Sequence, residues 1–254
     1  MVDSLIDSEV MDILLDFGET MMDSGAEIRR VEDSLARMGR SYGADETNVF
    51  VITSSIELTM HFGDGQTLTR TRRVRAAGAT DFCKLSELNA LSRKCAMERV
   101  PLETLKASVN HIRDRQISQV RSYIGSVLAA GGFSVFFGGS ILDGVISGLA
   151  ALLICWLQLK FSRLCPNKVF FLFVASFLMG LGVCCVNLMI PGLQVDKIII
   201  GDIMLLVPGI AITTAVRDTL IGDTISGVTR LADCLVWAAA LAAGIMIVIS
   251  MFAR

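Results

Sequence analysis

The residue types that could do chemistry at membrane depth lie in one apolar stretch, residues 198–217, with the sequence IIIGDIMLLVPGIAITTAVR. The stretch is long enough to cross a bilayer, yet it contains Asp202 and the pair Pro208-Gly209. An ionisable residue and a helix breaker are costly in a spanning segment and usually mark a path for a substrate or an ion. Asp202 is either a carboxylate near the outer face that water reaches or a cation or proton site, and the sequence leaves both open.

Pro208-Gly209 also allows two interpretations. The pair could form a tolerated kink, because Thr213, Thr214 and neighbouring helices can satisfy the freed backbone groups. Alternatively, the segment is a discontinuous helix whose second half begins near Gly209, where N–H groups would present positive potential to a carboxylate. We favour the discontinuous helix, because Asp202 lies in the same segment.

Arg217 and Asp218 close this segment and are followed by Gly222, Asp223 and Gly227. A basic residue at a helix C-terminus before a glycine-containing turn is common at a membrane interface. This role at the interface is the better supported interpretation of Arg217 and Asp218. Arg217 is also well placed to attract a cytoplasmic anion.

The elements that must position these residues are membrane helices, because the second half of the chain is strongly apolar. The 254 residues are 53% hydrophobic, with a mean hydropathy of +0.61, and residues 121–254 hold only six of the 25 Asp and Glu. A spanning helix needs about 20 apolar residues. Five segments satisfy this requirement: about 121–139, 141–159, 169–190, 198–216 and 231–251. Glycines in the first segment would allow close helix packing.

The basic residues beside these segments predict their orientation. Eight lie on one side and two, Lys197 and Arg254, on the other, which places the N-terminus in the cytoplasm and the C-terminus outside. The acidic N-terminus lacks the features of a signal peptide. A net charge of −2 argues against nucleic-acid binding, and the seven cysteines show no spacing typical of a metal site or of disulfides.

Residues 1–118 predict a small cytoplasmic α+β domain before the membrane domain at 119–254. Apolar periodicity indicates helices at about 4–22, 25–41, 81–98 and 101–118, around three strands in the order ααβββαα. Ser24 to Glu27 fits a capping box, which would give Glu27 a structural role.

The densest basic cluster of this domain is Arg70, Arg72, Arg73 and Arg75. A charged strand edge that prevents edge pairing is the favoured explanation, and an anion-binding surface is the alternative. His61 and His111 are isolated, and no nucleotide-binding loop is present. We therefore expect no enzymatic activity, no cofactor and no metal.

Several motifs together resemble the threonine/serine exporter family over about residues 5–250. They are GAEIRRVEDSLARMGRSYGA, ELNALSR, FFGGSILDG and LLVPGIAITTAVRD with GDTISG. By position, the resemblance assigns Gly25, Glu27, Arg30 and Glu32 to the motif of the soluble domain. In the membrane half it assigns Pro208, Gly209, Asp218, Gly222 and Gly227.

The resemblance implies a secondary exporter of threonine and serine, or of dicarboxylates such as succinate, in a bacterial inner or plasma membrane and driven by an ion gradient. Split members of the family pair with a shorter membrane subunit. The odd span count and the lack of an internal repeat agree with that. The alternatives are a membrane-anchored ligand sensor without transport, and a membrane-tethered hydrolase that would lose turnover on changing Glu27 or Glu32.

Overall fold

The computed structural model describes residues 2–63, 65–74, 80–116, 118–161, 165 and 167–252, with side chains from Ser8 onward. The chain forms two compact units. The first unit comprises Met1–Gln116 and Ile210–Leu231, and the second comprises Ile117–Gly209 and Ala232–Arg254. A short stretch of the apolar half of the sequence therefore packs with the N-terminal part of the chain.

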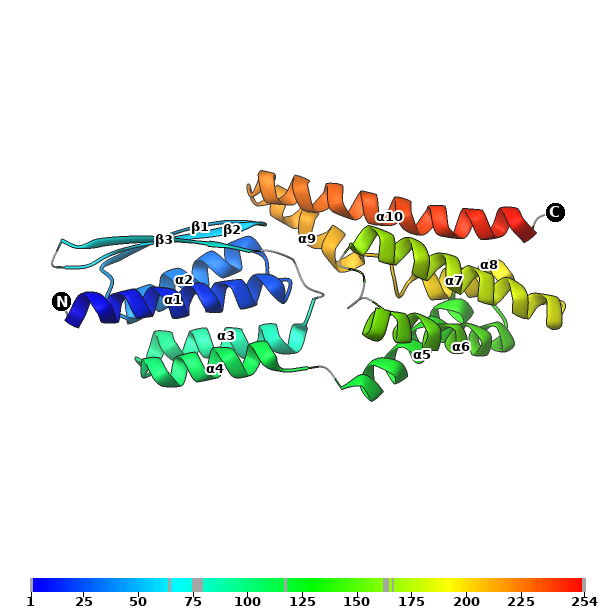
Figure 1. The fold of residues 1–254 in the computed structure, drawn as a ribbon, viewed down its shortest axis with the longest axis horizontal. Helices are drawn as coiled ribbons and strands as arrows, with labels where there is room; N and C mark the ends of the chain where they lie inside the picture. Colours follow the sequence, from blue (N-terminus) through cyan, green and yellow to red (C-terminus); the bar gives the residue numbers. More distant parts are fainter. Residues whose placement is uncertain are drawn as a thin grey trace. The chain divides into compact units, whose positions relative to one another are not determined.

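The first unit follows the predicted ααβββαα order (Figure 1). Its helices α1 and α2 lie between a three-stranded sheet and the pair α3 and α4, and helix α9 with the start of α10 completes it. The elements are α1 (Val2–Asp23), α2 (Ile28–Ser41), β1 (Glu46–Ile52), β2 (Ser55–His61), β3 (Thr67–Arg73), α3 (Phe82–Met97), α4 (Leu102–Asp114), α9 (Gly209–Leu220) and α10 (Thr224–Phe252).

The sheet is antiparallel in the order β1-β2-β3, with Glu46 opposite His61 and Ser55 opposite Arg73. Its central strand alternates, so that Ile56, Leu58 and Met60 are buried while the residues between them are not. This period of two turns one face towards α1 and α2. Among the residues whose side chains are described, those of the core cluster of the unit lie between Val10 and Ile112.

The turn between α1 and α2 is not the predicted capping box. Gly25 has a φ of +83°, and its N–H donates to the carbonyl of Met22 while that of Ala26 donates to Met21, which is the Schellman arrangement at a helix end. The Ser24 hydroxyl donates back to the Thr20 carbonyl. Glu27 is the N-cap residue of α2, but its side chain makes no capping bond, so that part of the prediction is wrong.

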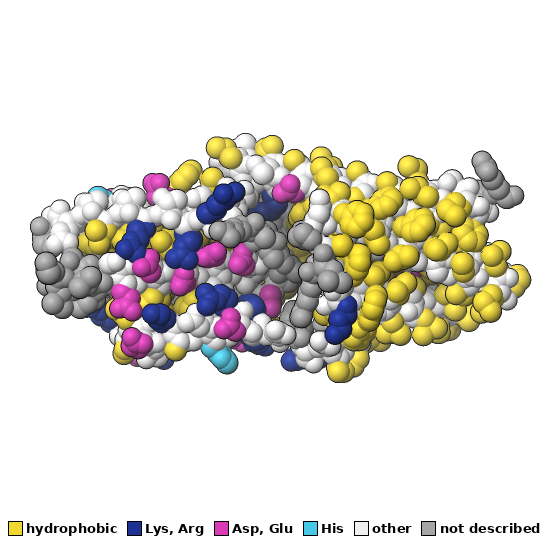
Figure 2. Space-filling view, viewed as in Figure 1, with side chains coloured by type: hydrophobic (Ala, Val, Ile, Leu, Met, Phe, Trp, Pro, Cys, Tyr) yellow, Lys and Arg dark blue, Asp and Glu magenta, His cyan; other side chains and the backbone are white. Residues whose placement is uncertain are grey.

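The second unit is helical and apolar. It contains α5 (Gln119–Phe136), α6 (Ile141–Trp156), a π-helical turn at Leu157–Phe161, α7 (Lys168–Met189), α8 (Val195–Ile203) and most of α10. On the face that Figure 2 shows, hydrophobic side chains dominate this unit, whereas basic and acidic side chains mix over the first unit.

Three helices of the described residues are long and apolar enough to cross a membrane: Ile141–Phe161, Lys168–Met189 and Thr224–Phe252. The chain is therefore a membrane protein, but the five predicted spans are not confirmed. The first predicted segment is α5, whose first turn is polar because it holds Gln119 and Arg121. The fourth predicted segment is not one helix.

That fourth segment is interrupted where the sequence suggested. Helix α8 ends at Ile203, turns follow through Val207, and α9 begins at Gly209 immediately after Pro208. Proline has no N–H to donate and its ring excludes a continuous helix in this position. The interpretation as a discontinuous helix with a second part beginning near Gly209 is confirmed.

Close backbone contacts join α5, α6 and α8. A Cβ on Gly131 would lie 2.7 Å from the carbonyl oxygen of Gly144, and one on Gly201 would lie 2.6 Å from that of Ala130. Such approaches are possible only for glycine, and small residues favour close packing of membrane helices. The predicted role of the glycines in the first segment is confirmed at Gly131, whereas a Cβ on Gly125, Gly132 or Gly138 would meet no atom within 4 Å.

Candidate functional site

Asp202 is fully buried at the end of α8. Its Oδ1 accepts a hydrogen bond of 2.9 Å from the hydroxyl of Ser147 on α6, while Oδ2 has no hydrogen-bond partner among the described residues. No described basic side chain forms an ion pair with it. Burying a carboxylate with a single partner is costly unless something offsets the charge. The arrangement can therefore hold a proton or a small cation.

The sequence did not indicate Ser147, and it did not indicate Ser134 on α5. Ser134 is fully buried, its hydroxyl has no partner among the described residues, and its Cβ lies 2.9 Å from where a Cβ on Gly201 would be. Both serines lie in the tightly packed helices α5 and α6. Their small size was a packing signal, and only the packing shows that they surround the end of α8.

Asp143 fixes the start of α6 and the approach to α8. Its Oδ2 accepts from the backbone N–H and the hydroxyl of Ser140, which completes a capping box, and its Oδ1 accepts from the backbone N–H of Gln194 at 3.0 Å. An acid at a helix N-terminus is favourable. Asp143 therefore positions α8, and with it Asp202, rather than offering a free carboxylate.

Glu27 and Arg217, far apart in the sequence, form an ion pair within the first unit. Arg217 Nη1 on α9 lies 2.5 Å from Glu27 Oε1 at the start of α2, and the two side chains are 58% and 22% exposed. The soluble-domain motif and the end of the fourth predicted segment thus meet. An exposed pair of this kind contributes about 0–1 kcal/mol to stability and opens easily.

Asp218 is buried, whereas its neighbour Arg217 is exposed. It is fully buried, and its Oδ2 lies 3.3 Å from Nη1 of Arg230 on α10. Burial raises the pKa of the Asp218 carboxyl, and Arg230 only partly opposes this. Gly222, with a φ of +105°, and Gly227, where a Cβ would meet the Thr219 hydroxyl, allow α9 and α10 to pack closely at this turn.

Glu32 is a structural residue of the sheet edge. Its Oε1 accepts the backbone N–H of Val51 at 3.0 Å, a donor of the outer strand β1. Burial raises the pKa of Glu32, and the bond from Val51 partly opposes the increase. An edge donor that is paired in this way cannot recruit another strand.

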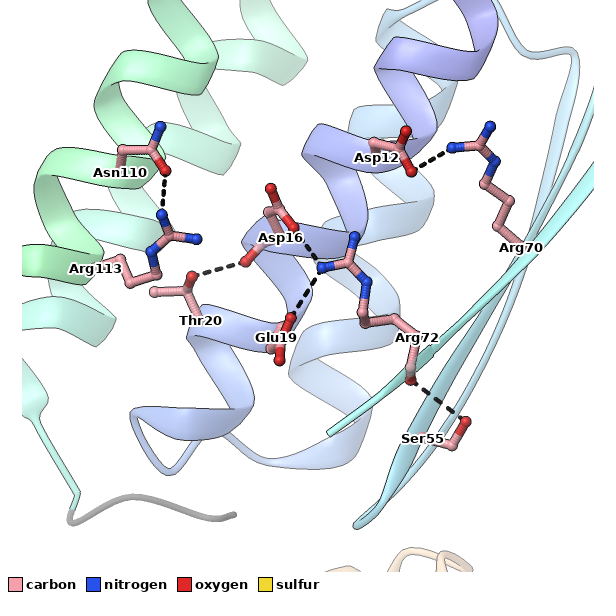
Figure 3. Close-up of polar contacts among 9 residues, drawn as sticks. All are labelled: Asp12, Asp16, Glu19, Thr20, Ser55, Arg70, Arg72, Asn110 and Arg113. Atoms are coloured by element: carbon pink, nitrogen blue, oxygen red, sulfur yellow. Dashed lines mark hydrogen bonds and ion pairs between the residues drawn. The ribbon is translucent and has the colours of Figure 1, made fainter. Parts of the chain in front are cut away.

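Two of the three arginines of β3, Arg70 and Arg72, are paired with acidic residues of α1 (Figure 3). Arg70 pairs with Asp12, and Arg72 donates to Asp16 at 2.6 Å and to Glu19 at 3.1 Å. β3 is an edge strand, as expected, but Arg70 and Arg72 hold it to α1 and do not form a free anion-binding surface. Arg75 lies outside the described residues.

The sequence matches a known protein family. Residues 12–252 match the family described as "Putative threonine/serine exporter". The chain belongs to the threonine/serine exporter family. A relative described as "Probable threonine/serine exporter" from Mycobacterium tuberculosis (strain ATCC 25618 / H37Rv) is 23% identical over 250 residues, which cover 97% of this chain and 47% of the relative. The chain spans about half the length of that curated relative, and no solved structure matches it.

The description of this family is that of an exporter. Within that assignment, the predicted site residues fall into separate groups. Asp202 lies in the second unit, Pro208 and Gly209 lie at the break between α8 and α9, and Glu27, Arg30, Arg217 and Asp218 lie in the first unit. In the described part of the chain, no group of three His, Cys, Asp or Glu could hold a metal ion.

Proposed function

We propose that this chain is a subunit of a secondary exporter that moves small carboxylate-bearing metabolites, threonine and serine or a dicarboxylate such as succinate. The observation that carries the proposal is Asp202, fully buried with Ser147 as its single hydrogen-bond partner, on a helix that is interrupted before Pro208. A buried carboxylate and a broken helix in one membrane segment are typical of transport pathways.

In this proposal an ion gradient drives export through Asp202. A proton or a small cation bound at the carboxylate offsets its burial, and its release to the other side of the membrane returns the charge. The hydroxyl of Ser147 on α6 orients the carboxylate. The N–H of Gly209 donates to the carbonyl of Val207, but the N–H groups of the next residues in the first turn of α9 are available to a carboxylate of the substrate, because they have no partner within the helix.

We further propose that a shorter membrane subunit of the same family completes the pathway. The family relative is about twice as long as this chain, so it contains a further portion of similar length in the same polypeptide. Transporters of this type commonly build their substrate site between two related halves. The N-terminus would face the cytoplasm, in agreement with the distribution of basic residues.

The test is efflux of labelled serine, threonine and succinate from cells that lack their own exporters. The chain is expressed alone and then with its companion subunit. Export only with the companion supports the split transporter, and export by the chain alone replaces it with a homo-oligomer. No export in either case, with both proteins folded in the membrane, would favour the membrane-anchored sensor instead.

Variants then test the residues. Asp202→Asn should abolish or uncouple export, because the neutral amide cannot exchange a proton, and Pro208→Ala should impair it by extending the helix. Asp196→Asn is the matched control, because Asp196 lies on the same helix with a side chain that is 66% exposed. If Asp202→Asn and Pro208→Ala both export as well as the parent at equal expression, the assignment of the site is wrong.

A further inference from the structure

A cavity of about 530 Å³ opens in the first unit between α2, α3 and α9. Its volume is within the range of sites for small ligands. Five arginines line it: Arg29, Arg30 and Arg37 from α2, Arg93 from α3 and Arg217 from α9. The only acidic residues in the lining are Glu27 and Asp33, so the cavity has three more positive than negative side chains.

Several arginines elsewhere in the unit pair with acids, as Arg70 does with Asp12 and Arg115 with Glu87. By contrast, Arg30, Arg37 and Arg93 form no ion pair with any residue that the structure describes. Like charges held together without counter-charges are unfavourable, and an anion in the cavity would relieve the repulsion.

The spacing of the arginines indicates the shape of that anion. Arg30 and Arg37 are seven residues apart on α2, which is two turns or about 10 Å along the helix. Arg93 and Arg217 approach from the other two helices. The arginines therefore line the cavity from positions spread along α2 and from two further helices. Each guanidinium can bind a carboxylate through two N–H groups.

We propose that this cavity binds a small dicarboxylate dianion on the first unit. One carboxylate replaces Glu27 as the partner of Arg217, beside Arg30, and the other is held by Arg37 and Arg93. The exposed Glu27–Arg217 pair is the competitor that a ligand must displace, and an exposed ion pair gives way readily. A zwitterion such as serine fits less well, because its ammonium group adds to the positive charge.

Binding to this cavity does not depend on the transport proposal, because it is measured without flux. The full-length chain, purified into nanodiscs of phosphatidylcholine to exclude anionic lipid, is titrated with succinate by calorimetry. We expect binding that weakens about tenfold or more in the double variant Arg30→Gln, Arg93→Gln. Glu27→Gln should bind succinate more tightly, because it removes the competing carboxylate.

Arg40→Gln is the matched control, because Arg40 is exposed on the same helix and does not line the cavity. It should bind succinate as the parent does. Arg30→Lys, which keeps the charge, replaces the double variant if that unfolds; it should bind succinate more weakly than the parent, because an ammonium cannot bind a carboxylate in the bidentate manner.

Three results would overturn the proposal. The first is undiminished succinate binding in the arginine variants, and the second is an equal loss in Arg40→Gln. The third is tighter binding of inorganic phosphate or of serine than of succinate, which would exclude a dicarboxylate as the ligand. If Asp202→Asn loses export but still binds succinate, the transport proposal and the binding proposal are both supported, because they rest on different sites.

Discussion

At the scale of single residues, Gly25 is the position where the backbone permits least variation. Its φ of +83° is one that L side chains rarely adopt, and a Cβ would lie 2.8 Å from the Thr80 hydroxyl. Gly25→Ala should therefore lower the free energy of unfolding by about 1–3 kcal/mol. Thermal or denaturant unfolding of the purified chain measures the loss.

Gly43→Ala separates the two causes of that loss. Gly43 also has a positive φ, +103°, but a Cβ there would meet no atom within 4 Å. This variant should lose only the contribution of backbone strain, about 1 kcal/mol. Equal losses in both variants would show that the contact with Thr80 does not matter.

Glu32 gives a prediction about pH. Burial raises its pKa above the ordinary value of 4.5, so the folded state holds the proton more tightly than the unfolded state. Its stabilising contribution is therefore fully present below about pH 4.5 and is lost as the pH rises from there towards the raised value. Glu32→Gln cannot ionise, so its stability relative to the parent should increase between acidic and neutral pH, as unfolding across a pH series would show.

The amide of Glu32→Gln can still accept the N–H of Val51, whereas Glu32→Ala cannot. The alanine variant should therefore be less stable than the glutamine variant by about 1–3 kcal/mol at every pH, because it leaves the N–H of the buried residue Val51 unpaired. A glutamine variant that is as destabilised as alanine at neutral pH would contradict the role of Glu32 as a hydrogen-bond acceptor.

The sequence could indicate which residues of the turn after α1 matter, but not what each of them does. A serine three residues before a glutamate fits a capping box, yet Gly25 fits a helix end equally well. The structure uses Gly25 for the helix end and leaves Glu27 free to reach Arg217. A contact between residues 190 positions apart follows only from the fold.

At the scale of elements, two adjacent glycines of α5 offer a sharp test of helix packing. Gly131 contacts the backbone of α6, whereas Gly132 has no atom within 4 Å of a Cβ. Gly131→Ala should force α5 away from α6 and cost about 1–3 kcal/mol. Gly132→Ala should leave stability unchanged or raise it, because alanine favours a helix. Thermal unfolding in one detergent compares the pair, and equal effects would contradict the close packing.

The elements themselves were largely predictable, because their signals are local. Helical and strand periodicity gave the ααβββαα order, and Pro208-Gly209 gave the break before α9. The partners of Asp202 were not predictable. Ser134 and Ser147 become its surroundings only through the packing of α5 and α6 against α8, and that packing depends on contacts between segments distant in the sequence.

At the scale of the whole molecule, hydropathy alone predicts five membrane spans, and three of them are long and apolar enough in the structure. Three helices satisfy the length and apolarity of a span, while the first and fourth predicted segments do not. Both exceptions hold the polar and small residues that the candidate site uses. A segment that lines a transport pathway is less apolar than one that faces lipid, so hydropathy identifies such a segment less clearly as a membrane span.

The last prediction concerns the independence of the N-terminal part of the chain. Among the described side chains, its hydrophobic core cluster lies between Val10 and Ile112, although residues 210–231 also belong to the first unit. A fragment of residues 1–116 should therefore fold by itself and unfold cooperatively. Leu14→Ala, at a fully buried position, should lower its free energy of unfolding by about 2–5 kcal/mol. Circular dichroism during denaturant unfolding measures both.

The fragment should nevertheless bind succinate more weakly than the full chain, because it lacks Arg217 and with it one side of the cavity. Cooperative unfolding of the fragment therefore reports on the core, and its succinate affinity reports on the cavity. A fragment without a cooperative transition, or one in which Leu14→Ala has no effect, would show that α9 and the start of α10 are required for folding. In that case the stretch Ile210–Leu231 would be part of the soluble fold and not only a wall of its cavity.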